Sequence, residues 1–176
     1  ADFRRQVQII FQDPRSSLDP RMAVEQIILE PLECLNFSQN HQARIDEVLQ
    51  QVELDLVIRS RYPHELSGGQ RQRVAIARAL AAQPSVLVAD EPVSALDVLA
   101  REEVLQLLSR LINQLGLTLV LISHDLSVVA QLCDKVAVMQ HGRIIESGAT
   151  QSVFGNPQHQ FTRELIAAVP QLPTLK

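Results

Sequence analysis

Residues 86–91 have the sequence Val-Leu-Val-Ala-Asp-Glu, in which four apolar residues are followed by two carboxylates. The apolar run predicts a short strand buried on both faces, which is typical of a parallel sheet. Ligands bind beyond the carboxyl ends of the strands in such a sheet. Asp90 and Glu91 can therefore divide the labour, one orienting a hydrated Mg²⁺ ion and the other activating water. The alternative is a local turn that Asp90 caps, with Glu91 merely solvated.

The chain beyond this run alternates helices and strands. A helix is predicted over residues 99–115, because apolar residues recur there at helical spacing and Gly116 can cap its end. Further elements are predicted as strands at 117–122, 136–139 and 143–146, helices at 126–132 and 161–169, and a turn at His141-Gly142. This alternation implies right-handed crossovers and an α/β fold with a mainly parallel sheet.

The residues before this region are predicted to be largely helical. A short strand at residues 7–11 leads into a polar turn at 12–17. Helices are predicted at 23–35, 43–54 and 70–82, and Pro31 is expected to kink or divide the first of them. The sequence thus consists of a helical half, up to about residue 82, and an α/β half.

The sequence Ser-Gly-Gly-Gln at residues 67–70 directly precedes the last of these three helices. Glycines let a backbone approach an anion closely, and a helix N-terminus offers unpaired N–H groups and the positive end of the helix dipole. Ser67 can add a hydroxyl donor to a phosphate oxygen. The alternative is that Ser67 is only an N-cap and the two glycines form an ordinary turn.

Two further polar residues follow predicted strands. His124 lies just beyond the strand at 117–122, at the sheet edge expected for Glu91, where an imidazole can hold a phosphate or a water molecule. Gln12 ends the strand at 7–11. Taken singly, each is better explained as a structural residue, His124 as a cap and Gln12 as an ordinary loop glutamine.

Composition argues against several classes of protein. A net charge of −4 disfavours a nucleic-acid binder that works by broad charge neutralisation. No apolar stretch approaches the roughly 18 residues of a membrane-spanning helix, and the first residues lack the apolar core of a secretory signal. Cys34 and Cys133 are interpreted as two buried, reduced thiols of a cytoplasmic protein, and a disulfide between them is the alternative. Arg71, Arg73 and Arg78 are interpreted as a solvated helix face that pairs with nearby carboxylates.

Taken together, the motifs resemble those of the ATP-binding cassette (ABC) ATPases in order and spacing. The resemblance rests on Leu-Ser-Gly-Gly-Gln at 66–70, Asp-Glu at 90–91, Ser-Ala-Leu-Asp at 94–97 and Ser-His-Asp at 123–125. It runs through nearly the whole chain and implies a P-loop NTPase-like α/β fold, N-terminally truncated, with a mainly parallel sheet and an ABC helical subdomain. The implied division is 1–12 for the start of the Q-loop region of the core, 13–83 for the helical subdomain and 84–176 for the C-terminal part of the core.

The resemblance also implies two cofactors, ATP and Mg²⁺, and roles for individual residues. Glu91 is implied as the general base and His124 as the switch histidine. Gln12 is implied as the Q-loop glutamine, linking Mg²⁺ and the attacking water to the membrane subunit, and Asp90 as the Walker B aspartate near Mg²⁺. The residues implied to meet the ATP held by an opposite domain are those of the signature and the D-loop aspartate, namely Ser67, Gly68, Gly69, Gln70 and Asp97.

One motif of the family is not found in the 176 residues. A Walker A loop, Gly-x-x-x-x-Gly-Lys-Ser/Thr, wraps the phosphates and places a lysine on them, and none of the six glycines here is followed by lysine. We expect this loop upstream of residue 1 in a full-length relative, and we therefore expect no useful ATP hydrolysis by the chain alone. We also expect an exposed sheet edge that favours self-association.

The spacing of the motifs excludes two classes within the family. Gln12 and Leu66 are separated by ordinary sequence without a heptad run, unlike the DNA-repair ATPases with their long coiled coil. Residues 90–97 lack the Asn-His of ribosome-associated members. Residues 11–22 and 156–165 resemble instead the oligopeptide, dipeptide and nickel importers.

The predicted function is that of an ABC-type ATPase subunit that energises peptide or nickel import, bound peripherally to the cytoplasmic side of the cell membrane. Its expected partners are a second ATPase domain, permease subunits that contact the Q-loop and helical subdomain, and indirectly a substrate-binding protein, but no nucleic acid. The surface around Arg15, Leu18 and Met22 is the candidate contact with the permeases. The alternative is a non-catalytic fragment or binding module that retains only the signature half-site.

Overall fold

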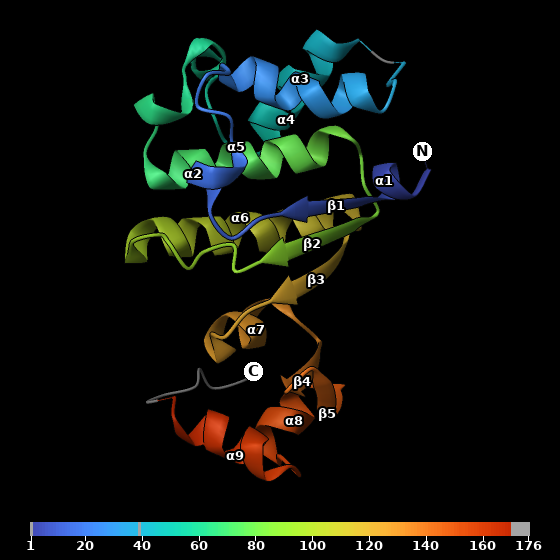
Figure 1. Cartoon of the computed structure of the whole chain (residues 1–176), viewed down its shortest axis with the longest axis vertical. Helices are drawn as coiled ribbons and strands as arrows, with labels where there is room; N and C mark the ends of the chain where they lie inside the picture. Colours follow the sequence, from blue (N-terminus) through green and yellow to red (C-terminus); the bar gives the residue numbers. More distant parts are fainter. Residues whose placement is uncertain (1, 39, 170–176) are drawn as a thin grey trace. The chain divides into compact units, whose positions relative to one another are not determined.

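The computed structural model describes residues 2–38 and 40–169, which fall into two compact units, Ala1–Ile122 (unit 1) and Ser123–Lys176 (unit 2) (Figure 1). Unit 1 contains α1 (Asp2–Gln6), β1 (Val7–Ile10), α2 (Pro14–Ser17), α3 (Val24–Cys34), α4 (His41–Gln51), the 3₁₀ helices η1 (Leu56–Ser60) and η2 (Pro63–Glu65), α5 (Gly68–Ala81), β2 (Val86–Asp90), α6 (Val98–Leu115) and β3 (Thr118–Ile122). Unit 2 contains α7 (Leu126–Leu132), β4 (Lys135–Gln140), β5 (Arg143–Ala149), α8 (Thr150–Gly155) and α9 (Gln160–Ala167).

A parallel sheet of three strands, in the order β1–β2–β3, forms the base of unit 1. At the ends of the strands, Ile10 of β1 is opposite Ala89 of β2, and Asp90 is opposite Ile122 of β3. The carboxyl ends of all three strands therefore meet at one edge. The predicted strands at 7–11, 86–89 and 117–122 and their parallel arrangement are confirmed to within about a residue.

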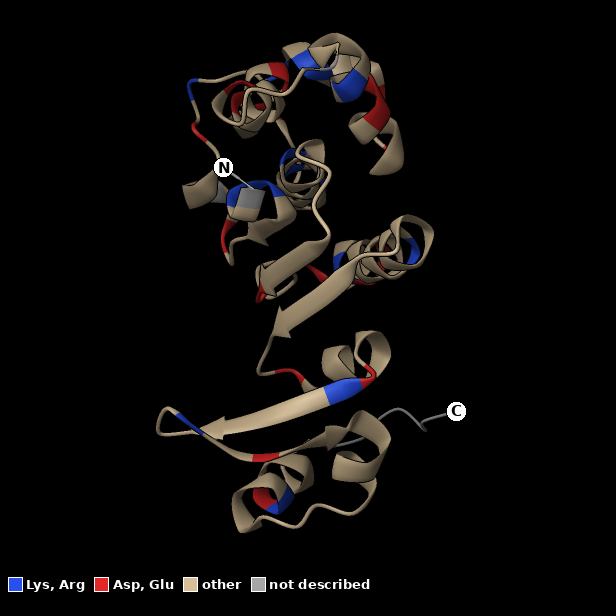
Figure 2. Ribbon diagram, turned by 90° about the vertical axis from the view of Figure 1, so that its right-hand side faces the viewer, with Lys and Arg blue, Asp and Glu red and all other residues tan. Residues whose placement is uncertain are grey.

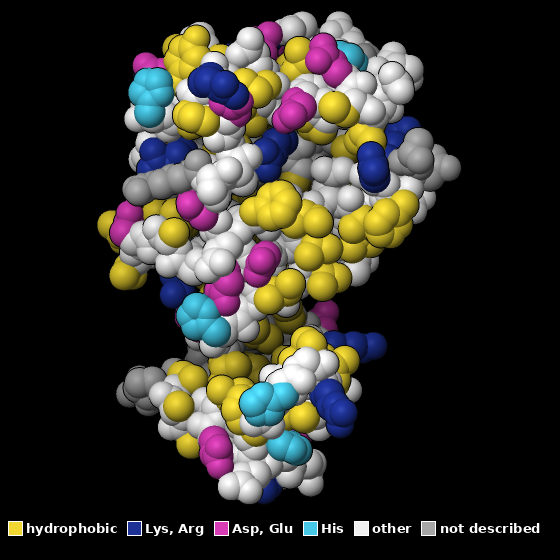
Figure 3. Space-filling model, viewed as in Figure 1, with side chains coloured by type: hydrophobic (Ala, Val, Ile, Leu, Met, Phe, Trp, Pro, Cys, Tyr) yellow, Lys and Arg dark blue, Asp and Glu magenta, His cyan; other side chains and the backbone are white. Residues whose placement is uncertain are grey.

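The two faces of this sheet differ in burial, so the prediction that the strand at residues 86–89 is buried on both faces is wrong. Leu87 of β2 is fully buried, whereas Val88, which points to the opposite face, is half-buried. On β3, Val120 and Ile122 are 46% and 53% exposed. The run of apolar residues predicts the strands but not how deeply each face of the sheet is buried. Helix α6 lies along one side of the sheet (Figures 1 and 2). Figure 3 shows hydrophobic side chains gathered over β1–β3.

Helix α5 is the most enclosed helix of unit 1. It contacts α2, α3, α4, α6 and strand β1. Its small and aliphatic residues let these neighbours approach, and the buried ones are Gln72, Val74, Ala75, Ile76, Ala77, Ala79, Leu80 and Ala81. Each large aliphatic side chain buried in this way contributes about 1.5–3 kcal/mol relative to an exposed one.

Helix α3 contains Pro31 but is not divided there. It runs without a break from Val24 to Cys34, with Pro31 in its last turn. A proline in a helix removes the hydrogen bond that its own N–H would have donated. The loss is offset by packing, because the side chains of Val24, Ile28 and Leu32 are fully buried. Of the two outcomes predicted for Pro31, a kink or a division of the helix, the division is therefore wrong, and the kink stays a prediction.

The C-terminus of α5 is held by a buried arginine. Arg44 of α4 is 5% exposed and donates hydrogen bonds to the carbonyl oxygens of Leu80 (2.6 Å) and Ala81 (3.2 Å). The last carbonyls of a helix have no partner within it and carry the negative end of the dipole. The guanidinium group therefore supplies a donor to Ala81, adds one to Leu80, whose carbonyl oxygen also accepts from the N–H of Gln83 (2.9 Å), and complements their charge. Its third nitrogen pairs with Glu47 at 2.7 Å.

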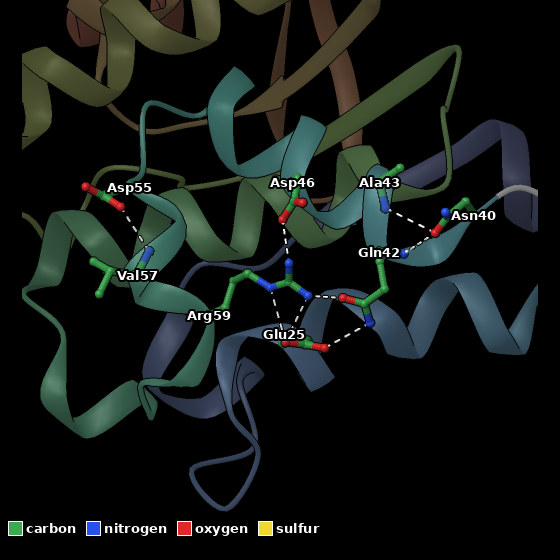
Figure 4. A network of polar contacts seen from close by, with 8 residues as sticks. All are labelled: Glu25, Asn40, Gln42, Ala43, Asp46, Asp55, Val57 and Arg59. Carbon is green, nitrogen blue, oxygen red and sulfur yellow. Dashed lines mark hydrogen bonds and ion pairs between the residues drawn. The ribbon is translucent and has the colours of Figure 1, made fainter.

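A second arginine joins α3, α4 and η1 (Figure 4). Arg59 of η1 donates to Glu25 of α3 (3.1 Å) and Asp46 of α4 (2.6 Å), and it also contacts Gln42 of α4. Gln42 donates to Glu25 at 3.0 Å. This hydrogen bond, with the charge of Arg59, lowers the pKa of Glu25 below its ordinary value. The network fixes the angle at which the helical segments meet.

Strands β4 and β5 of unit 2 form an antiparallel hairpin, so the prediction that residues 136–139 extend a mainly parallel sheet is wrong for this strand. The hairpin turn at His141 and Gly142 has φ angles of +48° and +75°. Two successive left-handed residues form the type I′ turn, whose twist matches that of antiparallel strands. The predicted turn at His141-Gly142 is confirmed, but the sequence analysis did not predict that it reverses the chain and pairs β4 with β5. Helix α8 was not predicted, because six residues give too short a periodic pattern.

Charged residues lie mainly on the helices and turns (Figure 2). The two cysteines are free thiols, as predicted, but Cys34 is exposed at the end of α3 and Cys133 is half-buried, so the prediction that both are buried is wrong. Within residues 2–38 and 40–169, no helix combines the length and the hydropathy needed to cross a membrane.

We predict that Arg44→Met lowers the free energy of unfolding by about 2–4 kcal/mol, because the carbonyl oxygen of Ala81 loses its side-chain donor and that of Leu80 keeps only backbone donors such as the N–H of Gln83. Urea unfolding followed by circular dichroism measures this change. Arg21→Gln is the control, since Arg21 is 87% exposed and pairs only with the neighbouring Asp19 among the contacts of the described residues. An equal shift of the urea midpoint in both variants would contradict the prediction.

Candidate functional site

Three of the predicted site residues meet at the carboxyl edge of the sheet in unit 1. Asp90 is the last residue of β2 and Glu91 follows it, while Gln12 lies two residues beyond the end of the adjacent β1. Asp90 and Glu91 are half-buried and Gln12 is exposed. The parallel register thus brings two carboxylates and an amide to one edge, as the sequence predicted.

The backbone of Glu91 is held in an unusual conformation. Its φ angle is +47°, in the left-handed region that residues with a Cβ atom seldom adopt. Its N–H donates to the carbonyl oxygen of Ile122 at the end of β3 (2.9 Å), and its own carbonyl accepts from the backbone N–H and hydroxyl of Ser94 (3.2 and 3.1 Å). Backbone strain that is held by its surroundings gathers at functional sites. The geometry therefore favours a specific role for Glu91 over the simple solvated residue.

The signature residues form the N-terminus of α5. Ser67 is the N-cap: its hydroxyl oxygen accepts from the N–H of Gln70 (3.2 Å), and the Gln70 side chain accepts from the N–H of Ser67 (3.0 Å). This reciprocal pair is a capping box. The N-cap role of Ser67 is thus confirmed. The same hydroxyl can still donate to a phosphate oxygen, because a hydroxyl that accepts a hydrogen bond keeps its own proton.

The turn before the signature is fixed by Arg71. Its guanidinium group donates to the carbonyl oxygens of Leu66 (2.8 Å) and Pro63 (3.2 Å). The prediction that the three arginines form a solvated face pairing with carboxylates is therefore correct for Arg73 only in its pairing with Glu53 and Glu103, since the Arg73 side chain is just 12% exposed. It is wrong for Arg71 and Arg78, which bond to carbonyl oxygens. These acceptors could not be predicted from sequence, because backbone carbonyls occur at every position.

The signature and the Asp97 segment are brought together by close packing. A Cβ atom on Gly69 would lie 3.2 Å from the Cβ atom of Ala100, and one on Gly68 would lie 3.5 Å from Leu96. Asp97 is the N-cap of α6, and its carboxylate accepts from the N–H of Ala100 at 3.0 Å. Two helix N-termini, each with its cap, therefore lie against one another. Their unpaired N–H groups and dipoles make this region suited to an anion.

A groove of about 530 Å³ lies beside the signature. It is lined by Glu53, Leu54, Ser67, Gly69, Gln70, Arg73, Ala100, Glu103, Gln106, Leu107 and Arg110. Glu53 accepts from Arg73 (2.8 Å) and pairs with Arg110 (2.7 Å), and these contacts lower the pKa of its carboxyl group. Sequence reasoning missed Glu53 and Arg110, since neither belongs to a motif.

A second groove, of about 610 Å³, lies on α2, α3 and α5. Arg78 donates to the carbonyl oxygen of Ser17 at its base (2.6 Å), and burial lowers the pKa of this guanidinium group despite the charge of Glu30. Leu18 and Met22 both line the groove, but Leu18 is only 1% exposed, so its interpretation as part of an open surface is wrong. The Arg15 side chain lies outside the described part of the chain.

The Ser-His-Asp motif begins unit 2. Asp125 is the N-cap of α7 and accepts from the N–H of Ser127 (2.9 Å), and its own N–H donates to the hydroxyl of Ser123 (3.0 Å). His124 is exposed between these two capping residues. The structure thus brings Gln12, Asp90 and Glu91 together within unit 1, whereas His124 belongs to unit 2 and its role stays a prediction.

The donor set at the sheet edge fits Mg²⁺ better than a metal that needs a full cage of protein ligands. Asp90 and Gln12 supply one carboxylate and one amide oxygen. Among the described residues, no group of three or more His, Cys, Asp or Glu side chains could hold a metal ion. Mg²⁺ keeps several waters and is commonly held by one or two protein ligands together with substrate phosphates.

We predict that Ser67→Ala destabilises the protein by about 1 kcal/mol through the lost N-cap, whereas Ser67→Asp, which can still cap, is close to neutral. Urea denaturation of the three proteins measures both effects. A Ser67→Ala variant as stable as the original protein would show that the capping box contributes nothing.

We predict that the stabilising effect of Glu53 is lost in acid. Because its pKa is lowered in the folded protein, the effect is fully present above the ordinary value of 4.5 and disappears as the pH falls through the folded-state pKa. The urea midpoints of the original protein and of Glu53→Gln should differ at neutral pH and converge as the pH falls below the ordinary carboxyl value of 4.5 and through the lowered folded-state pKa. A constant difference across this range would contradict the assignment.

The chain is similar to curated ATP-binding proteins of peptide transport. It is 52% identical over 169 residues to the oligopeptide transport ATP-binding protein OppD of Mycobacterium tuberculosis, covering 96% of this chain and 28% of that protein. It is 50% identical over 177 residues to the dipeptide transport ATP-binding protein DppF of Haemophilus influenzae, covering 98% of this chain and 54% of that protein. The chain thus spans between about a quarter and a half of these relatives.

Two solved structures share its fold. CbiO1 of Clostridium perfringens, part of the ABC transporter complex cbiONQ, superposes with a TM-score of 0.76 at 31% identity over 96% of this chain and 66% of the other. The ATP-binding cassette MJ0796, a dimer bound to ADP and phosphate, gives a TM-score of 0.71 at 31% identity over 84% of this chain and 65% of the other. These likenesses confirm the P-loop NTPase-like α/β fold. Since the family model for ABC transporters also matches residues 1–94, more than half of its length, the chain belongs to the ABC transporter family.

Proposed function

We propose that this chain serves in the ATP-binding and hydrolysing subunit of an ABC transporter that imports peptides. The observation that carries this proposal is the packing of two capped helix N-termini, at Ser67 and Asp97, in the same unit as the carboxylate edge. The paired helix N-termini are suited to bind phosphate, and the carboxylate edge is suited to activate water. The names of OppD and DppF support peptides over nickel as the substrate class.

The signature is proposed to bind the ATP held by a second ATPase domain. The Ser67 hydroxyl, which accepts from Gln70, would donate its proton to a phosphate oxygen, and the N–H groups at Gly68 and Gly69 would face the same anion. Side chains at these glycines would fill the space against Leu96 and Ala100. The dimer of the relative MJ0796 with ADP and phosphate supports such a shared site.

The sheet edge is proposed to act on the ATP of the chain's own cassette. Glu91 would accept a proton from the attacking water, and its constrained backbone would fix the direction of the carboxylate. Asp90 and Gln12 would hold Mg²⁺, which when bound neutralises charge on the phosphates. His124 would hold a phosphate oxygen or the water by hydrogen bonding.

The Q-loop and helical region is proposed to face the permeases. The residues that line the groove at α2, α3 and α5 include Ser16, four positions after Gln12, and Arg78 of α5. A partner bound in this groove would therefore touch both the segment that follows Gln12 and helix α5. The division into residues 1–12, 13–83 and 84–176 belongs to this proposal, as does a peripheral position on the cytoplasmic side of the membrane. The relative cbiO1, part of a transporter complex, supports the assembly.

The experiment measures ATP-dependent association of this chain with a second ABC domain that contains an intact Walker A loop. We expect MgATP to drive association, Ser67→Arg to abolish it and Glu91→Gln to leave it intact, since the shared site would use only the signature of this chain. Light scattering and phosphate release are followed together. Association without nucleotide, or an unaffected Ser67→Arg variant, would contradict the proposal and leave a passive binding module as the function.

The chain alone is expected neither to bind a fluorescent ATP analogue with Mg²⁺ nor to release phosphate, because its sequence contains no Walker A motif. Phosphate release that Glu91→Gln abolishes would instead show that another element supplies the phosphate cradle.

A further inference from the structure

Four charged side chains from three segments meet in the groove beside the signature. Glu53 lies in the turn after α4, Arg73 on α5, and Glu103 and Arg110 on α6. The Glu53 carboxylate accepts from Arg73 at 2.8 Å and pairs with Arg110 at 2.7 Å. Arg73, whose side chain is 12% exposed, also reaches Glu103 at 3.3 Å and the carbonyl oxygen of Val52 at 3.0 Å. One guanidinium group therefore ties α5 to its neighbours on two sides.

Glu53 occupies a backbone position that ordinarily favours glycine. Its φ angle is +57°, and the N–H of Leu54 donates back to the carbonyl oxygen of Leu49 (2.9 Å), which closes the end of α4. Glycine or asparagine commonly fills the left-handed position of such a helix end. A glutamate in this backbone conformation is strained, and its ion pairs with Arg73 and Arg110 offset the cost of that strain.

The face of α6 turned toward this network begins at the Asp97 cap. Ala100, Glu103, Leu107 and Arg110 follow one another at steps of three, four and three, which places them along one side of the helix. Ala100 lies against Gly69 of the signature, and Glu103 and Arg110 make the ion pairs one and three turns further on. The same side of α6 thus contacts the signature first and the charged network next.

We propose that Glu53 and Arg73 are positioning residues, which fix the N-terminus of α5 relative to the N-terminus of α6. The steric contact between Gly69 and Ala100 sets how closely the two ends approach, and the ion pairs prevent α5 from tilting about that contact. The signature and Asp97 then meet the nucleotide of an opposite domain as one rigid surface. This inference rests on the proposed function for its purpose, but the rigidity itself can be measured without nucleotide.

The first test is amide hydrogen exchange in the unliganded chain. The N–H groups of Arg71 and Arg101 close the first turns of α5 and α6 on the carbonyl oxygens of Ser67 (3.0 Å) and Asp97 (2.9 Å). In Glu53→Gln and in Arg73→Gln, we expect these two amides to exchange at least about fivefold faster while the amides of α3 keep their rates. The matched control is Glu102→Gln, which removes a neighbouring exposed carboxylate of α6 that accepts from Gln106 (2.9 Å) on the same helix.

Two results of this exchange experiment would overturn the inference. Unchanged exchange at both amides would show that the network fixes nothing. Equal acceleration throughout unit 1 would show that Glu53 and Arg73 only add general stability.

The second test uses the nucleotide-dependent association described above. We expect Glu53→Gln and Arg73→Gln to raise the MgATP concentration for half-maximal association about threefold or more while the extent at saturation stays the same. Arg73→Lys should be intermediate, since an ammonium group can keep the pair with Glu53 but not all three contacts. A lower extent at saturation with an unchanged midpoint would contradict the positioning role. If the original protein fails to associate at all, the proposed function fails, whereas the exchange experiment still decides the rigidity.

Discussion

The enclosure of helix α5 is the constraint on which the rest of unit 1 depends. Its C-terminus is held by the buried Arg44, its middle is packed by α3, α4 and β1, and its N-terminus carries the capping box of Ser67 and Gln70. A helix fixed at both ends and along its length has little freedom to shift. The glycines at its start can therefore lie close to α6 and still keep a defined geometry, which a loop could not provide.

Sequence reasoning was most successful where a local pattern decides the structure. The Ser-Gly-Gly-Gln motif and the apolar run ending at Asp90 located a helix start and a strand end, because caps and strands depend on a few adjacent residues. The parallel direction of β1, β2 and β3 also followed from the alternation of elements, whereas their order in the sheet was not predicted. The pairing of β4 with β5 did not, because the left-handed turn at His141-Gly142 outweighs the tendency toward a parallel crossover.

The parts of the site that escaped prediction are those that depend on residues distant in sequence. Glu53 belongs to no motif, and it gains significance only because folding places it beside Arg73 and Arg110. The exposure of Val120 and Ile122 was also hidden, since an apolar run gives no information about what lies on each side of a strand. Likewise, the left-handed backbone of Glu91 follows from the hydrogen bonds to Ile122 and Ser94 rather than from its own residue type.

The sheet register has a consequence for the order of folding. Ile10 pairs with Ala89, so β1 and β2 can join only after the whole helical segment between them has been gathered into a short span. Contacts between residues so far apart in sequence carry a large entropic cost of loop closure, and compact local structure in the loop reduces that cost. The packing of α3, α4 and α5 should therefore precede the sheet in time, with the sheet edge at Asp90 and Glu91 among the last parts of unit 1 to form.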